Sequence, residues 1–210
     1  PNKTIMSMSL KVVVPPHPLI GHWLTMMRNE DTPPPLYATG MEELGRWLTY
    51  ETVRDWLPHR NVEIKTSQAK TSGTMVESSV ALLSIPLLPG GLDLWQGARK
   101  VLPNAQLCLA GVPKGIGKSA GVIVFIDQIA SGEVLIKQMQ LLKEQNIEAR
   151  RIRVVTVLAS HPGLKNIGEA FQDLTIHCAC IDPDVTPEGE IVPGIGNPIV
   201  RLNRRSPGSN

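Results

Sequence analysis

A short glycine-containing turn follows a strongly apolar stretch of the chain and has the residue types of a phosphate-binding loop. The apolar stretch spans 122–126, and the turn consists of Ala130, Ser131 and Gly132, after which a helix-like segment begins. A strand, a tight turn and a helix start present backbone N–H groups to a phosphate. Ala130, Ser131 and Gly132 are therefore the candidate phosphate-binding residues.

The residue after this turn, Glu133, conflicts with phosphate binding. Its carboxylate stands where the negative charge of an anion would need to lie. Two like unit charges 4 Å apart near a protein surface repel by roughly 4 kcal/mol, and a phosphate carries nearly two charges. A penalty of this size is about the free energy of millimolar binding. The loop therefore has the shape of a phosphate site and a charge that opposes one.

The composition is that of one ordinary globular domain. The chain has 210 residues, of which 42% are hydrophobic and 19% are charged, and its net charge is +2. A chain of this length buries roughly 70% of its unfolded surface, so we expect a single domain over 1–210. The small net charge argues against a nucleic-acid partner. No apolar stretch approaches the ~20 residues of a transmembrane helix, so we expect a soluble protein.

The cysteines fit a reducing compartment. Cys108, Cys178 and Cys180 make an odd count, and residues 1–10 lack a secretory signal. We expect the cytoplasm or an equivalent compartment, without excluding the plastid stroma. Cys178 and Cys180 lie in an alternating run in which both would face the same way. They are interpreted as core residues rather than half of a metal site, because His177 alone does not supply a second ligand pair. We predict no metal site.

Beyond a helical beginning, strand-like and helical segments alternate. The apolar spacing predicts helices over 17–28, 36–57, 92–102, 132–145 and 162–171. Apolar runs predict strands over 62–66, 80–88, 105–110, 121–126, 153–159 and 174–181, with a polar loop over 68–73. Helices between buried strands require crossover connections, which favour a mostly parallel, twisted α/β sheet with helices on both faces. Residues 1–58 would form an N-terminal helical segment.

Two further segments invite a functional interpretation. Gly117, Lys118 and Ser119 match the end of a nucleotide-binding P-loop, but the earlier glycine of that motif would have to replace Val112. We therefore interpret 111–120 as a flexible basic turn. The tail 203–210 is predicted to be flexible, with a docking arm as the alternative.

Four collinear blocks carry a family resemblance. Residues 17–20, 43–55, 84–88 and 189–196 read HPLI, ELGRWLTYETVRD, SIPLL and GEIVPGIG. Over nearly its whole length the chain resembles uracil phosphoribosyltransferases. The resemblance implies a type I phosphoribosyltransferase fold that is usually dimeric, and a reaction of uracil with phosphoribosyl pyrophosphate to give UMP and pyrophosphate.

The phosphate loop departs from the family pattern, which reads approximately VDPMLATGGS. Aligned on 130–132, this chain has Glu133 for the second glycine and Val134 for the final serine. The family's acidic residue before the loop falls on Ile126, with Asp127 one place later. A one-residue offset in a strand turns a side chain to the opposite face. Asp127 is therefore a candidate catalytic residue only if the phosphate-binding turn begins before residue 130.

The base-binding end departs as well. The family's GLGDxGDR corresponds here to Gly194, Ile195, Gly196, Asn197 and, at its end, Arg201. Two carboxylates and a glycine are lost, while the two remaining glycines and the arginine match. These five residues are the candidates for base binding.

The pyrophosphate side and the cover of the site also change. Pro89 replaces the arginine that neutralises the leaving group, and proline offers no donor to a phosphate oxygen. The long excursion that covers the family's site shrinks to 111–120. A cationic transition state would then be exposed to water.

These departures lead to two main hypotheses. The first is a catalytically impaired homologue that serves as a structural or interaction subunit, since all parts of the site change together. The alternative is an active uracil phosphoribosyltransferase that uses Asp127, Ser131, Gly132 and Arg201. A regulatory module that binds a nucleotide without turnover is a third. We predict a homodimer or a subunit of a larger assembly and no cofactor, with Mg²⁺ entering only together with phosphoribosyl pyrophosphate.

Overall fold

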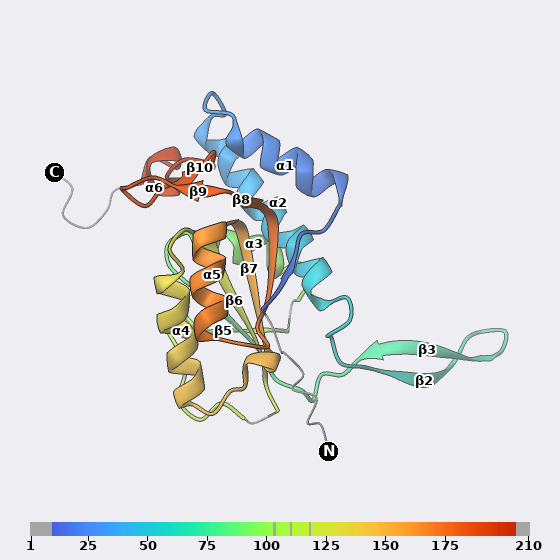
Figure 1. Cartoon of the computed structure of the whole chain (residues 1–210). Coiled ribbons are helices and arrows are strands. Elements are labelled where there is room, and N and C mark those ends of the chain that lie inside the picture. Colours follow the sequence, from blue (N-terminus) through green and yellow to red (C-terminus); the bar gives the residue numbers. More distant parts are fainter. Residues whose placement is uncertain (1–9, 103, 110, 118, 205–210) are drawn as a thin grey trace, which may run out of the picture.

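Six strands form one parallel sheet at the centre of the computed structural model (Figure 1). The structure describes residues 10–102, 104–109, 111–117 and 119–204. In spatial order the strands are β1 (Lys11–Val13), β8 (Thr175–Asp182), β7 (Ile152–Ser160), β6 (Gly121–Ile129), β4 (Leu82–Pro86) and β5 (Gln106–Leu107). Every neighbouring pair is parallel, so the carboxyl ends of the strands meet at one edge of the sheet.

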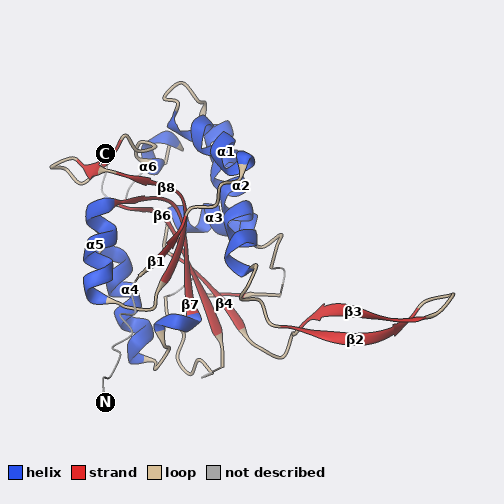
Figure 2. Cartoon of the chain, turned by 45° about the vertical axis from the view of Figure 1, so that its right-hand side comes forward, coloured by secondary structure: helices blue, strands red, loops and turns tan. Residues whose placement is uncertain are grey.

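Helices cover both faces of this sheet (Figure 2). One layer consists of α1 (Pro18–Arg28), α2 (Pro34–Val53) and α3 (Gly90–Ala98), and the other of α4 (Glu133–Glu144) and α5 (His161–Ala170). Each layer packs over its own hydrophobic cluster. The expected mostly parallel α/β fold with helices on both faces is therefore confirmed. Within the described residues, no helix combines the length and apolar character needed to cross a membrane.

The central strands follow from their apolar sequences. Val122 and Val124 of β6 pack beneath α4 and α5, while Ile123 and Phe125 pack beneath the α2 and α3 layer. All four side chains are fully buried. A continuous apolar run suits a strand that is covered on both faces, which is why this segment could be recognised as a strand from its sequence.

Near the carboxyl edge, the alternation of faces breaks at the same level in two strands. Val157 and Leu158 of β7 both contact the cluster under α2, and so do Ala179 and Cys180 of β8. The two strands keep the same register on both sides of this level, but Val157 and Ala179 themselves are not paired. Cys178 lies in the opposite cluster, so the expectation that Cys178 and Cys180 face the same way was wrong. Such local distortions re-aim side chains next to functional sites.

The N-terminal part was predicted to be helical throughout, but it also contains a strand. The strand β1 precedes α1 and forms the edge of the sheet beside β8. Three residues are too few to show a period, which explains why this strand was missed. The second helix begins at Pro34 rather than at 36, because prolines are tolerated in a first helical turn. It ends at Val53 rather than at 57.

The polar loop predicted over 68–73 is wrong. Most of it belongs to strand β3 (Lys70–Val76), which forms an antiparallel hairpin with β2 (His59–Lys65). This hairpin projects away from the body of the molecule (Figure 1). Both of its faces are largely exposed, so its sequence does not show the hydrophobic alternation of a half-buried strand.

Several short elements also differ from expectation. The predicted strand over 105–110 is only β5, and the third helix covers Gly90–Ala98 instead of 92–102. The short elements η1 (Ala149–Arg151), β9 (Asp184–Val185), β10 (Ile191–Val192) and α6 (Pro198–Arg201) were not predicted. Of the predicted flexible tail, Arg204 is anchored to Asp93 by two hydrogen bonds of 2.6 Å. Residues 205–210, and Lys118 of the P-loop-like segment, lie outside the described residues.

Candidate functional site

The carboxyl edge of the sheet carries a polar cleft. A cavity of about 260 Å³ opens between the end of β6 and the segment that flanks β10. Its walls consist of Gln128, Ala130, Gly189, Glu190, Ile191, Pro193, Gly196, Asn197 and Pro198. Ligands of parallel α/β sheets bind outside the carboxyl ends of the strands. This carboxyl-edge cleft is therefore the candidate site.

The candidate phosphate-binding turn is held in place at the end of β6. Gly132 has a φ of 83°, and a Cβ there would lie 2.9 Å from a carbonyl oxygen of α5. Ser160 Oγ donates to the carbonyl of Ala130 at 2.5 Å, and Asn166 Nδ2 donates to the carbonyl of Ser131 at 3.0 Å. The first-turn N–H groups of α4 have no intrahelical partners. The three predicted residues thus adjoin a helix N-terminus suited to an anion, although only Ala130 lines the cavity itself.

Glu133 lies at the surface of the protein. It is the first residue of α4, and its side chain is exposed to solvent. An exposed carboxylate acts through water, where two unit charges at 4 Å repel by only about 1 kcal/mol. The same carboxylate favours the helix, because negative charge in a first turn complements the helix dipole. The repulsion of a phosphate by Glu133 is thus smaller than its sequence position suggests.

Asp127 lies on the strand and not on the turn. The predicted catalytic role of Asp127 required that the turn begin early. The strand β6 continues to Ile129, so this condition is not met. The side chain faces the start of α3, since a Cβ added at Gly90 would overlap the Asp127 carboxylate. Burial raises the pKa of Asp127, a backbone N–H hydrogen bond opposes this, and the carboxylate of Asp93 raises it further. Ile126, at the aligned position, packs in the core beneath α4 and α5.

The candidate base-binding turn closes the other side of the cleft. Gly194 and Gly196 have φ values of 68° and 73°, a backbone region that glycine enters without strain. Gln128 Nε2 donates to the carbonyl of Gly196 at 3.1 Å and so ties the turn to the end of β6. Gln128 was not a predicted site residue. Its only sequence signal is its position two residues before the phosphate turn.

Three of the predicted base-binding residues serve the structure of this turn. Asn197 Oδ1 accepts from the backbone N–H of Ile199 and caps α6. Ile195 is 1% exposed and belongs to the core. The Arg201 guanidinium donates to carbonyl oxygens of Met27 and Asn29, at 3.2 and 2.7 Å, and lies over the Tyr37 ring. Among the predicted set, only Gly196 and Asn197 line the cavity.

A partly buried ion pair that the sequence did not reveal supports the same turn. Arg28 donates to both carboxylate oxygens of Asp182, at 2.9 and 2.6 Å, and to the carbonyl of Gly194 at 2.8 Å. The N–H of Gly194 donates back to Asp182 at 2.9 Å. Burial alone would raise the pKa of Asp182, but the hydrogen bonds from Arg28 and Gly194 lower it overall. Arg28 and Asp182 are 154 positions apart, so no local pattern could have paired them.

Three arginines near the cleft, Arg28, Arg201 and Arg204, are already engaged by other groups. Pro89 stands directly before α3, where it supplies no donor. Arg204 reaches the first turn of α3 from the C-terminal segment, but both of its Nη atoms donate to Asp93. Arg28 is paired with Asp182, and Arg201 is occupied by backbone carbonyls.

The described residues also contain no group of three or more His, Cys, Asp or Glu side chains placed to hold a metal ion. Cys178 is buried and Cys180 is half-buried, and they lie on opposite sides of β8. The two thiols therefore do not face a common metal site. Mg²⁺ commonly takes one or two carboxylates together with substrate phosphates. Asp127 suits that arrangement only where a ligand supplies most of the oxygen atoms.

Known proteins match this chain over most of its length. The family model for uracil phosphoribosyltransferase matches residues 14–201. A uracil phosphoribosyltransferase of Synechococcus elongatus is 36% identical over 213 aligned positions, which cover 94% of this chain and 98% of that protein. The chloroplastic uracil phosphoribosyltransferase of Arabidopsis thaliana is 34% identical, over 89% of this chain and 68% of that protein.

A solved structure agrees with these sequences. The AQ2163 protein from Aquifex aeolicus matches with a TM-score of 0.79 and 25% identity, over 91% of this chain and 97% of the other. The family model covers the elements from α1 to α6. The chain belongs to the uracil phosphoribosyltransferase family.

Proposed function

We propose that the protein is an active uracil phosphoribosyltransferase that converts uracil and phosphoribosyl pyrophosphate to UMP and pyrophosphate. The observation that carries this proposal is the turn at 130–132, which lies at the start of α4 beside the carboxyl-edge cleft, with Gly132 in a left-handed backbone conformation. The exposure of Glu133 weakens the main objection to phosphate binding there. Relatives with this name, 36% identical over 94% of the chain, support the same activity. The support favours this alternative over an impaired homologue.

In this reaction N1 of uracil bonds to C1′ of the ribose while the C1′–O bond to pyrophosphate breaks. The pyrophosphate leaves with the bonding electrons, and the N1 proton must pass to a base or to water. Asp127 lies on β6 and not on the turn, but its carboxylate faces Gly90 at the start of α3, on the pyrophosphate side, and burial raises its pKa. A carboxylate with a raised pKa is a better proton acceptor at neutral pH. Mg²⁺ would enter with the pyrophosphate oxygens, near Asp127.

A second candidate function is that of a non-catalytic family member. One observation favours it, namely that every arginine described around the cleft is already engaged: Arg28 by Asp182, Arg204 by Asp93 and Arg201 by backbone carbonyls. Phosphates are usually held by arginine or lysine through charge-assisted hydrogen bonds. Such a protein would keep the scaffold for an assembly and bind phosphoribosyl pyrophosphate poorly.

Two measurements separate these candidates. In the first, the protein is incubated with labelled uracil, phosphoribosyl pyrophosphate and Mg²⁺, and the formation of UMP is measured. In the second, calorimetry measures the binding of phosphoribosyl pyrophosphate. We expect micromolar binding, UMP formation, and at least about a hundredfold loss of rate in Asp127→Asn. The matched control is Glu144→Gln, at the far end of α4. Absence of both UMP and binding at millimolar ligand would overturn the proposal and leave the second candidate.

A further inference from the structure

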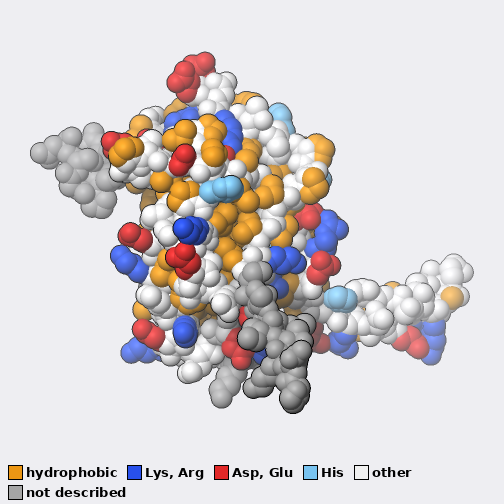
Figure 3. Space-filling model, viewed as in Figure 1, with side chains coloured by type: hydrophobic (Ala, Val, Ile, Leu, Met, Phe, Trp, Pro, Cys, Tyr) orange, Lys and Arg blue, Asp and Glu red, His pale blue; other side chains and the backbone are white. Residues whose placement is uncertain are grey.

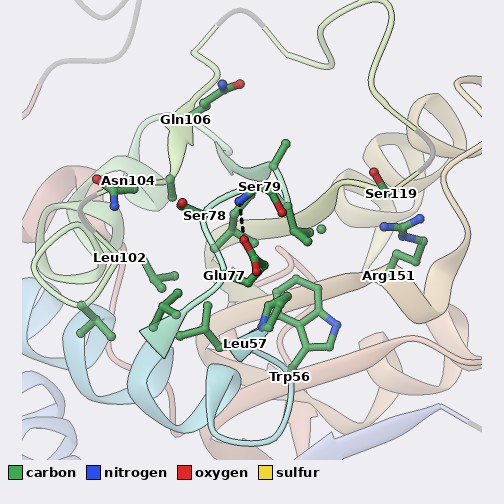
Figure 4. Close-up of a pocket in the computed structure, with 18 residues that line it drawn as sticks. Trp56, Leu57, Glu77, Ser78, Ser79, Leu102, Asn104, Gln106, Ser119 and Arg151 are labelled. Carbon is green, nitrogen blue, oxygen red and sulfur yellow. Dashed lines mark hydrogen bonds between the residues drawn. The ribbon is translucent and has the colours of Figure 1, made fainter. Parts of the chain in front are cut away.

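A second and larger cavity lies at the amino ends of the strands, away from the carboxyl-edge cleft. Its volume is about 440 Å³, within the range of pockets that hold small organic ligands. Leu82 and Gly121 line it from the first residues of β4 and β6. Because these strands are parallel, their amino ends lie at the edge opposite to the carboxyl-edge cleft. This amino-edge cavity is shown in Figure 4.

The floor of the amino-edge cavity is apolar and anchored. Trp56, Leu57 and Leu102 face its interior (Figure 4). The Trp56 ring is fixed between two neighbours. A Cβ at Gly121 would lie 2.7 Å from the ring, and the Arg153 guanidinium lies 5.0 Å from the ring centroid on another element. The cavity therefore offers a preformed surface for an aromatic or branched apolar group.

The charges on the rim do not cancel. Glu77 accepts the N–H of Ser79 at 3.1 Å and pairs with Arg60 at 3.2 Å, which compensates its charge. Arg151, which also lines the cavity, pairs with no carboxylate among the described residues. The neighbouring Arg150, by contrast, is paired with Glu148. The rim is left with one uncompensated positive charge.

The Arg151 guanidinium lies apart from the apolar side chains Leu57 and Leu102, although polar side chains such as Asn104 also line the cavity beside Leu102 (Figure 4). Arg151 and Ser119 lie on one side of the cavity, while Leu57 and Leu102 lie on the other, with Trp56 between them (Figure 4). An acidic group at Arg151 would leave the rest of its molecule over the indole ring. Guanidinium groups bind carboxylate and sulfonate-like oxygens through directed, charge-assisted hydrogen bonds.

We propose that the amino-edge cavity binds a small amphipathic organic anion, with its acidic group at Arg151 and its apolar, preferably aromatic, body over Trp56 and Leu102. The site is independent of the carboxyl-edge cleft and of the activity proposed for it. It lies at the opposite ends of the same strands, so both sites can be filled at once. No covalent step is involved.

The probe for this proposal is 8-anilinonaphthalene-1-sulfonate, whose fluorescence increases in an apolar site. Titration of the full chain is expected to show one saturable site per chain. Arg151→Gln should weaken binding about tenfold, the lower end of the effect of a lost charge-assisted hydrogen bond. The matched control is Arg150→Gln, whose side chain does not line the cavity and which should leave the affinity unchanged.

An uncharged probe tests the role of the charge. N-phenyl-1-naphthylamine has the same rings without the sulfonate, so its affinity should be the same for the wild type and for Arg151→Gln. Equal binding also shows that the variant is folded. Phosphoribosyl pyrophosphate at millimolar concentration should not displace the anionic probe. The proposal is overturned by non-saturable binding, by equal loss in both arginine variants, or by displacement with phosphoribosyl pyrophosphate.

Discussion

At the scale of single residues, the side chains around the carboxyl-edge cleft divide into those that face it and those that build it. Gln128 and Asn197 line the cavity, whereas Arg28, Asp182 and Arg201 hold the turn at 194–197 from behind. A buried carboxylate that has lost its cation is costly. The ion pair of Arg28 with Asp182 therefore acts on the cleft indirectly, through the position of the turn.

Glu133 provides the most direct test of the phosphate turn. Replacement by Gln should strengthen phosphoribosyl pyrophosphate binding about fivefold, because an exposed like charge costs about 1 kcal/mol. The same change should lower the free energy of unfolding by about 0.5 kcal/mol, because it removes a favourable interaction with the helix dipole. Calorimetry and urea unfolding measure the two effects. Unchanged affinity with reduced stability would mean that no phosphate binds at this helix start.

His177 predicts a pH dependence of stability. Burial lowers its pKa to about 4, and Arg153 and Lys11 act in the same direction while Glu51 opposes them. In the unfolded chain its pKa is about 6.5, so between these values only the unfolded state binds the proton. The free energy of unfolding should therefore fall by about 2 kcal/mol from pH 7 to pH 5. Urea unfolding at both pH values should show this loss in the wild type and a smaller loss in His177→Gln; identical losses would contradict the assignment.

At the scale of secondary-structure elements, close helix packing determines where the start of α3 lies. Two glycines let α2 and α3 approach: a Cβ at Gly45 would overlap the backbone of Leu94, and one at Gly97 would overlap the backbone of Glu42. Gly90 makes the corresponding space for Asp127. The contact between the two helices thus places the residues that flank the pyrophosphate side.

Alanine substitutions test this packing. Gly97→Ala should destabilise the protein by about 3 kcal/mol, because the added methyl group meets backbone that cannot move aside easily. The matched control is Gly21→Ala in α1, where no atom lies within 4 Å of the added Cβ. That control should stabilise the protein by about 0.5–1 kcal/mol through helix propensity. Denaturant unfolding compares the two, and equal effects would show that α2 and α3 are less closely packed than described.

At the scale of the whole molecule, the β2–β3 hairpin is the feature that the single chain leaves unexplained. Figure 3 shows it standing clear of the body, with charged side chains toward its far end. Ile64, Met75 and Val76 are 44%, 53% and 58% exposed. An isolated two-stranded ribbon is marginally stable in water, which suggests that this one packs against another chain. We expect the second copy of the chain, in the homodimer that the family resemblance implies, to be this partner.

We expect the protein to be a dimer in solution and the hairpin to be needed for it. Replacing residues 61–75 by a short glycine-serine linker should give a monomer, because most of the hairpin is removed together with the exposed apolar side chains Ile64 and Met75. Light scattering after size exclusion measures the mass of both forms. The matched control, Glu63→Gln, breaks only an exposed ion pair with Lys70 and should stay dimeric, since such pairs contribute little. A dimeric linker variant, or a monomeric wild type, would contradict the expectation.

The sequence by itself determined the α/β class, the buried strands and the family, because long apolar runs such as 122–126 and four collinear blocks are local patterns. It also indicated the candidate phosphate-binding turn at 130–132, which the structure places between β6 and α4. It missed β1 and the hairpin, since three residues show no period and a solvent-exposed ribbon shows no alternation.

Only the tertiary structure decided what the polar residues do. It turned Glu133 to solvent, placed Asp127 against Gly90, and assigned Arg201 to backbone carbonyls. It also paired Arg28 with Asp182 across 154 positions. The physical reason is that a side chain's charge and hydrogen-bond partners come from segments distant in the chain, whereas helix and strand preferences come from neighbouring residues.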